Sequence, residues 1–582
     1  MSSSLLHRWF PFLSWPRPTS ALLQGEFWAG MTVGLMLVPQ GVAYAALAGM
    51  PLVTGIYASL VPALVAVLWS SSTRLGVGPT ALTSLLIGAS ITGLAEPGSA
   101  HWVTLAVWMA LLSGLLQLLL GVVRFGWLLN LVTSPVLGGF TQAAALLILA
   151  SQLPDLLGLR TSWSALAVSP SLHHFDLRAL AFGLGSLGCL VLARRWRSSF
   201  PAAIVVIALA ALISWAMGYA DADGAVIGHL PSGLPTLYWP GWLSWEEMGA
   251  LVMPVMVVTL VSFLETASSA KVEHHQGGTR WNENQDLIAH GMAKISSGLC
   301  GSFATSASFS RSAINLYAGA KSGWATLFAL VLVLVLATLL WLTSALYHVP
   351  QPVLAAVVVT AVTSLIKPAG MFRLWRVSRV ETAIGLVTFG LTLATAPRMY
   401  WGVLVGLLMN LSHFLYQRLH PRIIEVGLHP DGSLRDRHLW QLPPLAPELL
   451  ALRMDAELDF ASANALERRV TDELAQRPSI RHLCLFALPI NRIDVTGVEA
   501  FIRLRTLLQS HGGTLHVTGI KLPVQHTLDN AGALAPGPNF ALYRTDAEAI
   551  AALQRLAPPD AGKPASAPQS DTSGPAQPLP KL

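Results

Sequence analysis

The sequence predicts a polytopic α-helical membrane protein that ends in a small α/β domain. Of its 582 residues 53% are hydrophobic and only 11% charged, whereas soluble proteins carry about 25% charged residues. Apolar runs at 102–122, 248–263 and 324–346 are long enough, at about 1.5 Å per residue, to cross or nearly cross a hydrocarbon layer of about 30 Å. Beyond about residue 420, short strand patterns alternate with amphipathic helices.

Residues 27–420 are predicted to form a transmembrane domain in the lipid bilayer. Apolar runs and their breakers give about fourteen membrane segments, some too short to span alone. Residues 1–26 are expected in the cytoplasm, because Arg8 and Arg17 precede the first span and no cleavage site follows. The loop 219–247 has acids but no Lys or Arg, which places it outside and the C-terminus in the cytoplasm. The expected location is the cell (inner) membrane.

Several classes of protein are excluded by what the sequence lacks. Cys189, Cys300 and Cys484 lie far apart, so neither disulfides nor a metal site are expected. No nucleophile motif or phosphate-binding loop is present, so the chain is expected neither to be an enzyme nor to hold a cofactor. The net charge of +6 reflects membrane orientation, because no basic stripe with aromatic residues indicates nucleic-acid binding.

Two short segments, one in each half of the membrane region, open with glycine or small polar residues before they become helical. They are residues 75–85, which begin Leu-Gly-Val-Gly-Pro-Thr-Ala, and residues 301–313. Pro79 suits the first turn of a helix, where its missing N–H costs nothing. Each segment is therefore predicted to be a half-helix that begins inside the membrane. The alternative is a pair of kinked structural helices in which glycine serves close packing.

The start of a half-helix favours an anion, because its backbone N–H groups are free and its dipole is positive there. Two starts aimed at one point near the membrane midplane would each stabilise an anion by about 1–2 kcal/mol. Arg311 follows the start of the second segment and adds a fixed positive charge. Paired interruptions of this kind are typical of secondary transporters, so the sequence predicts a carrier of small anions.

Three motifs resemble those of the SulP anion transporters, the sulfate permease type. The first is Val-Pro-Gln-Gly-Val-Ala-Tyr at 38–44 with Gly-Ile-Tyr at 55–57. The second is Gly-Pro at 78–79, and the most specific is Ser-Phe-Ser-Arg-Ser-Ala-Ile-Asn at 308–315. The resemblance implies a seven-plus-seven inverted repeat, core and gate domains that move as an elevator, a homodimer, and a cytoplasmic STAS domain. It also assigns the substrate-binding residues: Gln40, Tyr44, Thr80, Ala81, Ser310 and Arg311.

Glu265 is the one acidic residue deep inside an apolar span. An ionised carboxylate there is costly, so it must be protonated, paired or bound to a cation. The resemblance makes Glu265 the acid that binds the coupling ion, and Ser269 matches a sodium-ligating position of the bicarbonate branch. Proton coupling is preferred because the 308–315 motif is closest to proton-driven sulfate carriers. The alternative is a structural Glu265 that pairs only with Arg311.

The sequence thus predicts proton-coupled sulfate uptake by a secondary active transporter. A sodium-coupled bicarbonate or dicarboxylate symporter, a passive anion channel and a membrane sensor are the alternatives. His290 and Lys294, four residues apart on one helix face, either tune the response to pH or face a domain interface or water. Glu273, His274 and His275 are expected in a solvated loop at a helix end.

The C-terminal region is predicted to hold a linker at 421–445, a STAS domain at 446–556 and a disordered tail at 557–582. Strands and helices are expected at 448–458, 463–474, 480–488, 497–510 and 514–520. Asp494 or Thr496 can cap the helix that begins near Gly497. Both are candidate regulatory residues, since a phosphate on Thr496 would lie at this helix start, and a cytoplasmic partner is expected to bind the domain.

Overall fold

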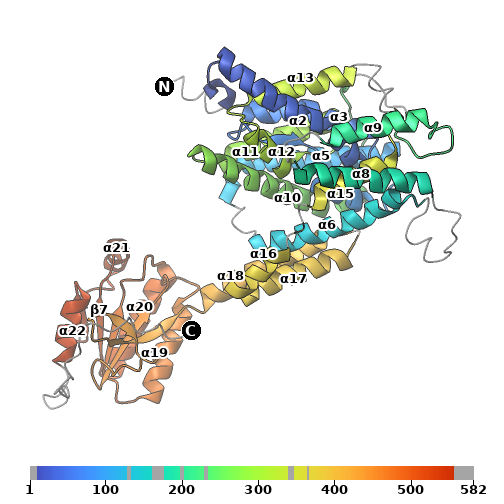
Figure 1. The fold of residues 1–582 in the computed structure, drawn as a ribbon. Coiled ribbons are helices and arrows are strands. Elements are labelled where there is room, and N and C mark those ends of the chain that lie inside the picture. The colour runs from blue at the N-terminus through green and yellow to red at the C-terminus, as the bar shows by residue number, and fades with distance from the viewer. Residues whose placement is uncertain are drawn as a thin grey trace, which may run out of the picture. The chain divides into compact units, whose positions relative to one another are not determined.

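The structure, a computed structural model, describes residues 10–127, 133–159, 176–196, 202–228, 234–338, 347–363, 366, 368–396 and 398–555 (Figure 1). The chain divides into two compact units, Met1–Asn410 and Leu411–Leu582. The predicted tail at 557–582 lies outside the described residues.

The first unit is almost entirely helical, as its apolar composition predicts. Five of the described helices, α2, α3, α5, α6 and α10, are long and apolar enough to cross a membrane. Shorter apolar helices of 10–17 residues accompany them. Its elements in chain order are η1 (Pro11–Ser14), α2 (Ser20–Leu47), α3 (Leu52–Trp69), β1 (Gly76–Gly78), α4 (Ala81–Ile91), α5 (Ala100–Val122), α6 (Ser134–Leu157), α8 (Leu177–Trp196), α9 (Ala202–Ala216), α10 (Trp245–Gly277), α11 (Glu283–Leu299), β2 (Ser306–Ser308), α12 (Phe309–Tyr317), α13 (Trp324–Thr338), α15 (Gln351–Val362), α16 (Pro368–Val377), α17 (Arg379–Ala394) and α18 (Tyr400–Leu419).

These helices pack as two bundles. In the first, α11 packs against α5 and α3, α2 packs against α3 and α13, and the short helices α4 and α12 both pack against α2 and α10. In the second, α6 packs against α8, α15 and α17, and Figure 1 shows α6 beside α17. Glycines allow the closest approach in this bundle: a Cβ on Gly139 of α6 would lie 2.2 Å from the carbonyl oxygen of Gly385 on α17.

Both predicted interruptions are present, and a small sheet joins them. Strand β1 pairs antiparallel with β2, with Gly76 opposite Ser308 and Gly78 opposite Ser306. Helix α4 begins three residues after β1, and α12 follows β2 directly. The two short helices therefore start beside one another, although 227 residues separate Ala81 from Ser308.

The second unit is an α/β domain with the sheet order β4-β3-β5-β6-β7-β8. Strands β5 to β8 are parallel, whereas β3 and β4 are antiparallel to their neighbours. All five elements predicted between 448 and 520 are confirmed within a few residues. The elements are β3 (Ile423–Leu428), β4 (Leu434–Asp436), β5 (Leu449–Met454), α19 (Ala463–Gln476), β6 (His482–Phe486), α20 (Val495–Ser510), β7 (Thr514–Thr518), α21 (Leu522–Asn530), β8 (Phe540–Tyr543) and α22 (Asp546–Gln554).

The structure differs from the linker expected at 421–445, because these residues form β3 and β4 and extend the sheet. Glu425 of β3 is only 2% exposed and forms ion pairs with Arg437 at 2.8 Å and Arg477 at 3.1 Å. These pairs join β3 to the segment after β4 and to the end of α19. The ion-pair partners of Glu425 lie 12 and 52 residues away in the sequence. The residues around Glu425 therefore do not reveal that it is buried in a strand, and the prediction of a linker is wrong here.

A row of polar rings crosses β6, β7 and β8. His482 Nδ1 lies 3.1 Å from His516 Nε2, and His516 Nδ1 lies 3.2 Å from the Tyr543 hydroxyl. Burial, and then the charge of His482, lowers the pKa of His516 to about 4. His516 is therefore neutral in the folded domain, while its pKa in the unfolded chain is about 6.5.

We expect the free energy of unfolding of the domain to decrease as the pH falls from about 6.5 toward 4, because His516 takes up a proton readily only in the unfolded chain. The expected loss is about 1 kcal/mol at pH 5 after allowance for partial solvent screening. Hydrogen exchange of peptides from β6 and β7, corrected for intrinsic rates, measures it in the full chain. His516→Leu should remove most of this pH dependence, and an unchanged dependence in that variant would contradict the explanation.

Candidate functional site

The junction of β1, β2, α4 and α12 requires glycine at two positions. A Cβ on Gly76 would lie 2.6 Å from Cβ of Arg311, too close for any other residue. Gly78 has φ 151°, a conformation that favours glycine. The amide of Gly76 also donates to the Ser312 hydroxyl at 3.0 Å, which joins β1 to α12. The Gly-Val-Gly sequence therefore permits the two helix starts to approach.

Each short helix begins with a hydroxyl cap. Thr80 Oγ1 accepts from the amide of Thr83 at 3.3 Å, and Ser308 Oγ accepts from the amide of Arg311 at 3.5 Å. The amides of Ala81 and Ser310 have no acceptor among the described residues, as expected for the first turn of a helix. Ser310 is an exposed residue, whereas Arg311 beside it is buried. Free N–H groups and positive dipole ends thus meet at one place.

Arg311 lies at this junction with 1% of its surface exposed. Its Nη2 donates to the carbonyl oxygen of Pro79 at 2.9 Å, just before α4, and its Nη1 donates to Gln40 Oε1 at 3.3 Å. Its Nε has no partner among the described residues, and within them Arg311 forms no ion pair. A buried cation with neutral acceptors only is costly unless an anion joins it.

Helix α2 contributes Gln40 and Tyr44 from one face. Pro39 lies inside α2 directly before Gln40 and removes a backbone donor there. A Cβ on Gly55 of α3 would lie 1.9 Å from the carbonyl oxygen of Gly41, so two glycines hold α2 against α3 at this level. Tyr44 is 4% exposed and one turn from Gln40, where the charge of Arg311 acts on its hydroxyl.

Glu265 of α10 reaches the same junction. Its Oε2 accepts from Thr80 Oγ1 at 3.0 Å, so one threonine caps α4 and also binds the carboxylate. Glu265 is partly buried, and no ion pair joins it to Arg311 in the part of the chain that the structure describes. Ser269 donates to the backbone carbonyl oxygen of Glu265 at 3.0 Å, so its hydroxyl bonds to its own helix. The structure thus brings Gln40, Tyr44, Thr80, Ala81, Ser310, Arg311 and Glu265 together.

Lys294 is a residue of this region whose position the sequence left open. Its side chain is 0% exposed, which excludes contact with water, and its ammonium donates to Ser262 Oγ and Gln117 Oε1. His290, one turn earlier on α11, is 2% exposed. The sequence shows Ser262 three residues before Glu265 on the same helix. It does not show which face of α11 meets α10, so the contact between Lys294 and Ser262 could not be predicted.

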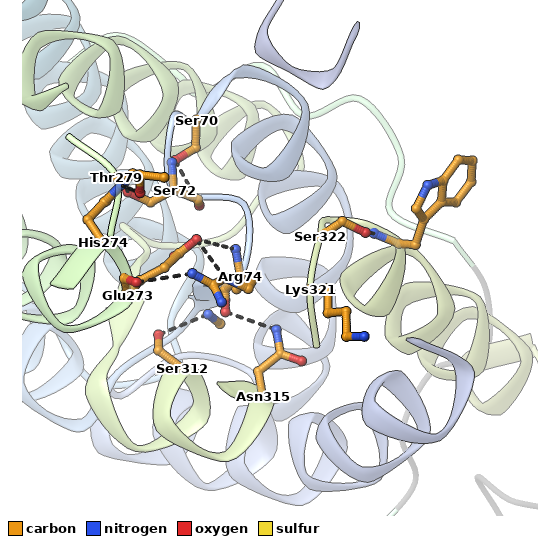
Figure 2. Close-up of polar contacts among 12 residues, drawn as sticks. Ser70, Ser72, Arg74, Glu273, His274, Thr279, Ser312, Asn315, Lys321 and Ser322 are labelled. Atoms are coloured by element: carbon orange, nitrogen blue, oxygen red, sulfur yellow. Dashed lines mark hydrogen bonds and ion pairs between the residues drawn. The ribbon is translucent and has the colours of Figure 1, made fainter. Parts of the chain in front are cut away.

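Figure 2 shows a second polar cluster, in which α10 meets the segment that leads into β1. Arg74 Nε forms an ion pair with Glu273 Oε1 at 3.1 Å, and Asn315 Nδ2 donates to the carbonyl oxygen of Arg74 at 2.9 Å. His274 Nε2 lies 3.1 Å from Ser72 Oγ. All three residues, Glu273, His274 and His275, lie near the end of α10, as predicted, and His275 is exposed. The expected solvated position is wrong for Glu273, which is 3% exposed, and His274 is partly buried.

In the α/β domain, Asp494 is the N-cap of α20. Its Oδ1 accepts from the amide of Gly497 at 2.8 Å, and its Oδ2 accepts from the amide of Phe460 at 3.0 Å. Thr496 is partly exposed on the first turn of α20. The regulatory role of the two residues stays a prediction, since capping by itself accounts for Asp494.

Comparison with known proteins places these features in context. A model described as the Sulfate permease family matches residues 23–388, and a STAS domain model matches residues 444–549. A probable sulfate transporter of Mycobacterium tuberculosis is 30% identical over 543 residues, which cover 92% of this chain and 96% of the relative. The sodium-independent sulfate anion transporter of Bos taurus is 29% identical and covers 91% of this chain and 89% of the relative. The structure of the murine Slc26a9 anion transporter superposes with a TM-score of 0.84 at 21% identity, over 95% of each chain.

Proposed function

The chain belongs to the sulfate permease family of membrane transporters, and on this basis we propose that it takes up sulfate together with protons as a secondary active transporter. The predicted helical membrane fold and STAS domain are shared with the family. Sulfate is named in both relatives described above, and one of them is named as independent of sodium.

The observation that carries this proposal is the environment of Arg311. A guanidinium that is 1% exposed lies where two half-helices begin, and its hydrogen-bond acceptors are a carbonyl and an amide oxygen. Burying a charge without a counter-charge is unfavourable, so an anion from solution completes the site. The free amides of Ala81 and Ser310 and the side chains of Gln40 and Tyr44 would hold that anion.

Glu265 is the proposed proton-binding group, with Ser269 as a ligand only if sodium is carried. Because Thr80 bonds to Glu265 and also caps α4, a change in the protonation of this carboxylate acts directly on one wall of the anion site. Such a shared contact is the simplest way for proton and anion binding to depend on one another.

Movement of the first bundle, which holds the site, against the second would give the elevator mechanism that the family resemblance implies. The proposed protein is a homodimer in the cell (inner) membrane with its N-terminus and STAS domain in the cytoplasm. A cytoplasmic partner would bind the STAS domain, with Asp494 and Thr496 as the candidate regulatory residues.

Uptake of labelled sulfate into vesicles that contain the purified protein tests this function. We expect accumulation above the external concentration when the outside is acidic, no requirement for sodium, and stronger competition by unlabelled sulfate than by bicarbonate or small dicarboxylates. A sodium requirement would favour a sodium-coupled symporter instead. Flux that only equilibrates sulfate at every gradient would favour a passive channel.

A further inference from the structure

Lys294 carries a second buried positive charge that the transport scheme does not yet use. It lies on α11, and its ammonium donates to Gln117 of α5 and Ser262 of α10, both of them neutral. All three side chains are at most 1% exposed. A buried ammonium with neutral acceptors is costly unless a carboxylate or a bound anion balances its charge.

Glu265 is the carboxylate that acts on Lys294. Ser262 lies three residues before Glu265 on α10, so the two side chains are neighbours on the helix surface. The charge of Glu265 acts on Lys294 and on Arg311, yet no ion pair joins it to either cation among the described residues. Glu265 instead accepts from Thr80. Neither cation is therefore neutralised by direct contact with this carboxylate among the described residues.

Other titratable groups near Lys294 have partners of their own or carry no charge. Asp286, two turns earlier on α11, is 0% exposed and accepts from Ser70, Ser71, Ser72 and Trp281. His290 is 2% exposed with no partner for either ring nitrogen among the described residues, which favours a neutral ring.

The titratable residues of α3 and α5 are Tyr57 and His101, and His101 lies 2.8 Å from Glu247. On α2, Tyr44 is buried beside Arg311.

The charges at the site therefore depend on Glu265 and on the anion. With Arg311 and Lys294 positive, a divalent anion gives a neutral site only when Glu265 carries a proton. A monovalent anion gives a neutral site only when Glu265 is ionised. An ionised Glu265 repels a dianion about twice as strongly as a monoanion, so protonation of Glu265 favours the divalent anion more than the monovalent one.

We propose that Lys294 is the specificity residue that fits the site to a divalent anion carried with one proton. Without Lys294, the same reasoning makes the site neutral for a monovalent anion and a protonated Glu265. This inference rests on the proposed role of Glu265 in proton binding, and it adds the reason why a dianion is selected over a monoanion.

The test compares Lys294→Met with the parent chain, using sulfate as the divalent probe and nitrate as the monovalent one. Neither anion titrates between pH 5.5 and pH 7.5, so the protein alone causes any pH effect. Binding is followed by thermal stabilisation of the full-length purified protein at both pH values. Lys321→Met is the matched control, since Lys321 is exposed and its hydrogen bond to Glu26 comes from the backbone amide, which the substitution keeps.

In the parent and in Lys321→Met, sulfate should bind at least about tenfold more tightly at the lower pH, and nitrate should gain less from the lower pH because it carries half the charge. In Lys294→Met, sulfate affinity should fall about tenfold and nitrate affinity only about threefold, because the ammonium attracts a dianion about twice as strongly as a monoanion. A purely structural role for Lys294 would weaken both anions alike and would leave the ratio of their affinities unchanged.

The proposal is overturned if the Lys294 variant folds and keeps the parent's preference for sulfate at both pH values. If Lys294→Met does not fold, Lys294→Gln retains hydrogen bonding to Ser262 without the charge and carries the same test. Failure of the proposed function is distinguishable: the parent would then accumulate no sulfate under a proton gradient. Proton-driven uptake with an unchanged valence preference in the variant would reject only the role of Lys294.

Discussion

Replacing Arg311 with glutamine will weaken sulfate binding by up to about 100-fold and abolish uptake. Arg311 is the fixed charge at the meeting point of α4 and α12, and hydrogen bonds from a charged donor contribute up to about 3 kcal/mol, which corresponds to roughly 100-fold in affinity. The pairing of β1 with β2 and the hydrogen bond from the Gly76 amide to Ser312 do not involve the Arg311 side chain, so the junction itself should persist. Binding of labelled sulfate to the purified protein measures the effect.

Two further variants show whether the charge or the shape of Arg311 matters. Arg280→Gln removes one positive charge at an exposed position of the same unit and should bind sulfate like the parent. Arg311→Lys keeps the charge but cannot reach both Pro79 and Gln40, so it should retain part of the affinity. Parent-like sulfate binding by folded Arg311→Gln would rule out the anion site proposed above.

Replacing Glu265 with glutamine will abolish accumulation of sulfate driven by a proton gradient, while sulfate binding at pH 5.5 stays within about threefold of the parent. The amide cannot take up or release a proton, but its oxygen can still accept from Thr80. Exchange of labelled for unlabelled sulfate should therefore continue in vesicles that show no concentrative uptake. Comparison of these two rates in the same vesicles is the measurement.

The matched control for Glu265 is Glu96→Gln, which changes an exposed carboxylate of the same unit and should leave both rates unchanged. Full concentrative uptake by Glu265→Gln would remove this residue from the coupling scheme. Loss of binding and exchange together would instead indicate that Glu265 supports the structure of the site rather than proton transfer.

Local features of the site were predictable because they depend on short stretches of chain. Gly-Pro at 78–79 interrupts one helix and starts the next. The hydroxyls of Thr80 and Ser308 each cap a helix by accepting from the backbone amide three residues later. The position of Arg311 on the first turn of α12 follows from the same local pattern. The strands and helices between 448 and 520 were also predictable, because short apolar segments alternate there with amphipathic segments.

Features that depend on pairing across the chain were not predictable. From its neighbours in the sequence, Glu273 is simply a charged residue near the end of a helix. It becomes part of a buried ion pair because Arg74, from a distant part of the chain, packs beside it. Strand β4 has only three residues, and β3 carries the charged Glu425, whose burial depends on ion-pair partners elsewhere in the domain. The sequence of α11 does not show which neighbouring helices its faces meet, so contact of Lys294 with Gln117 and Ser262 could not be inferred.

Hydropathy, helix breaks and caps are encoded over a few residues, so the membrane helices, the two interruptions and the C-terminal α/β pattern follow from the chain alone, and the motif resemblance adds the STAS assignment. Which charges share a site depends instead on how distant segments pack. Thr80 and Glu265 are 185 residues apart, and Gln40 and Arg311 are 271 apart. Contacts over such separations form only when β1 pairs with β2 and the helices pack around them, since nothing in either segment alone selects its partner.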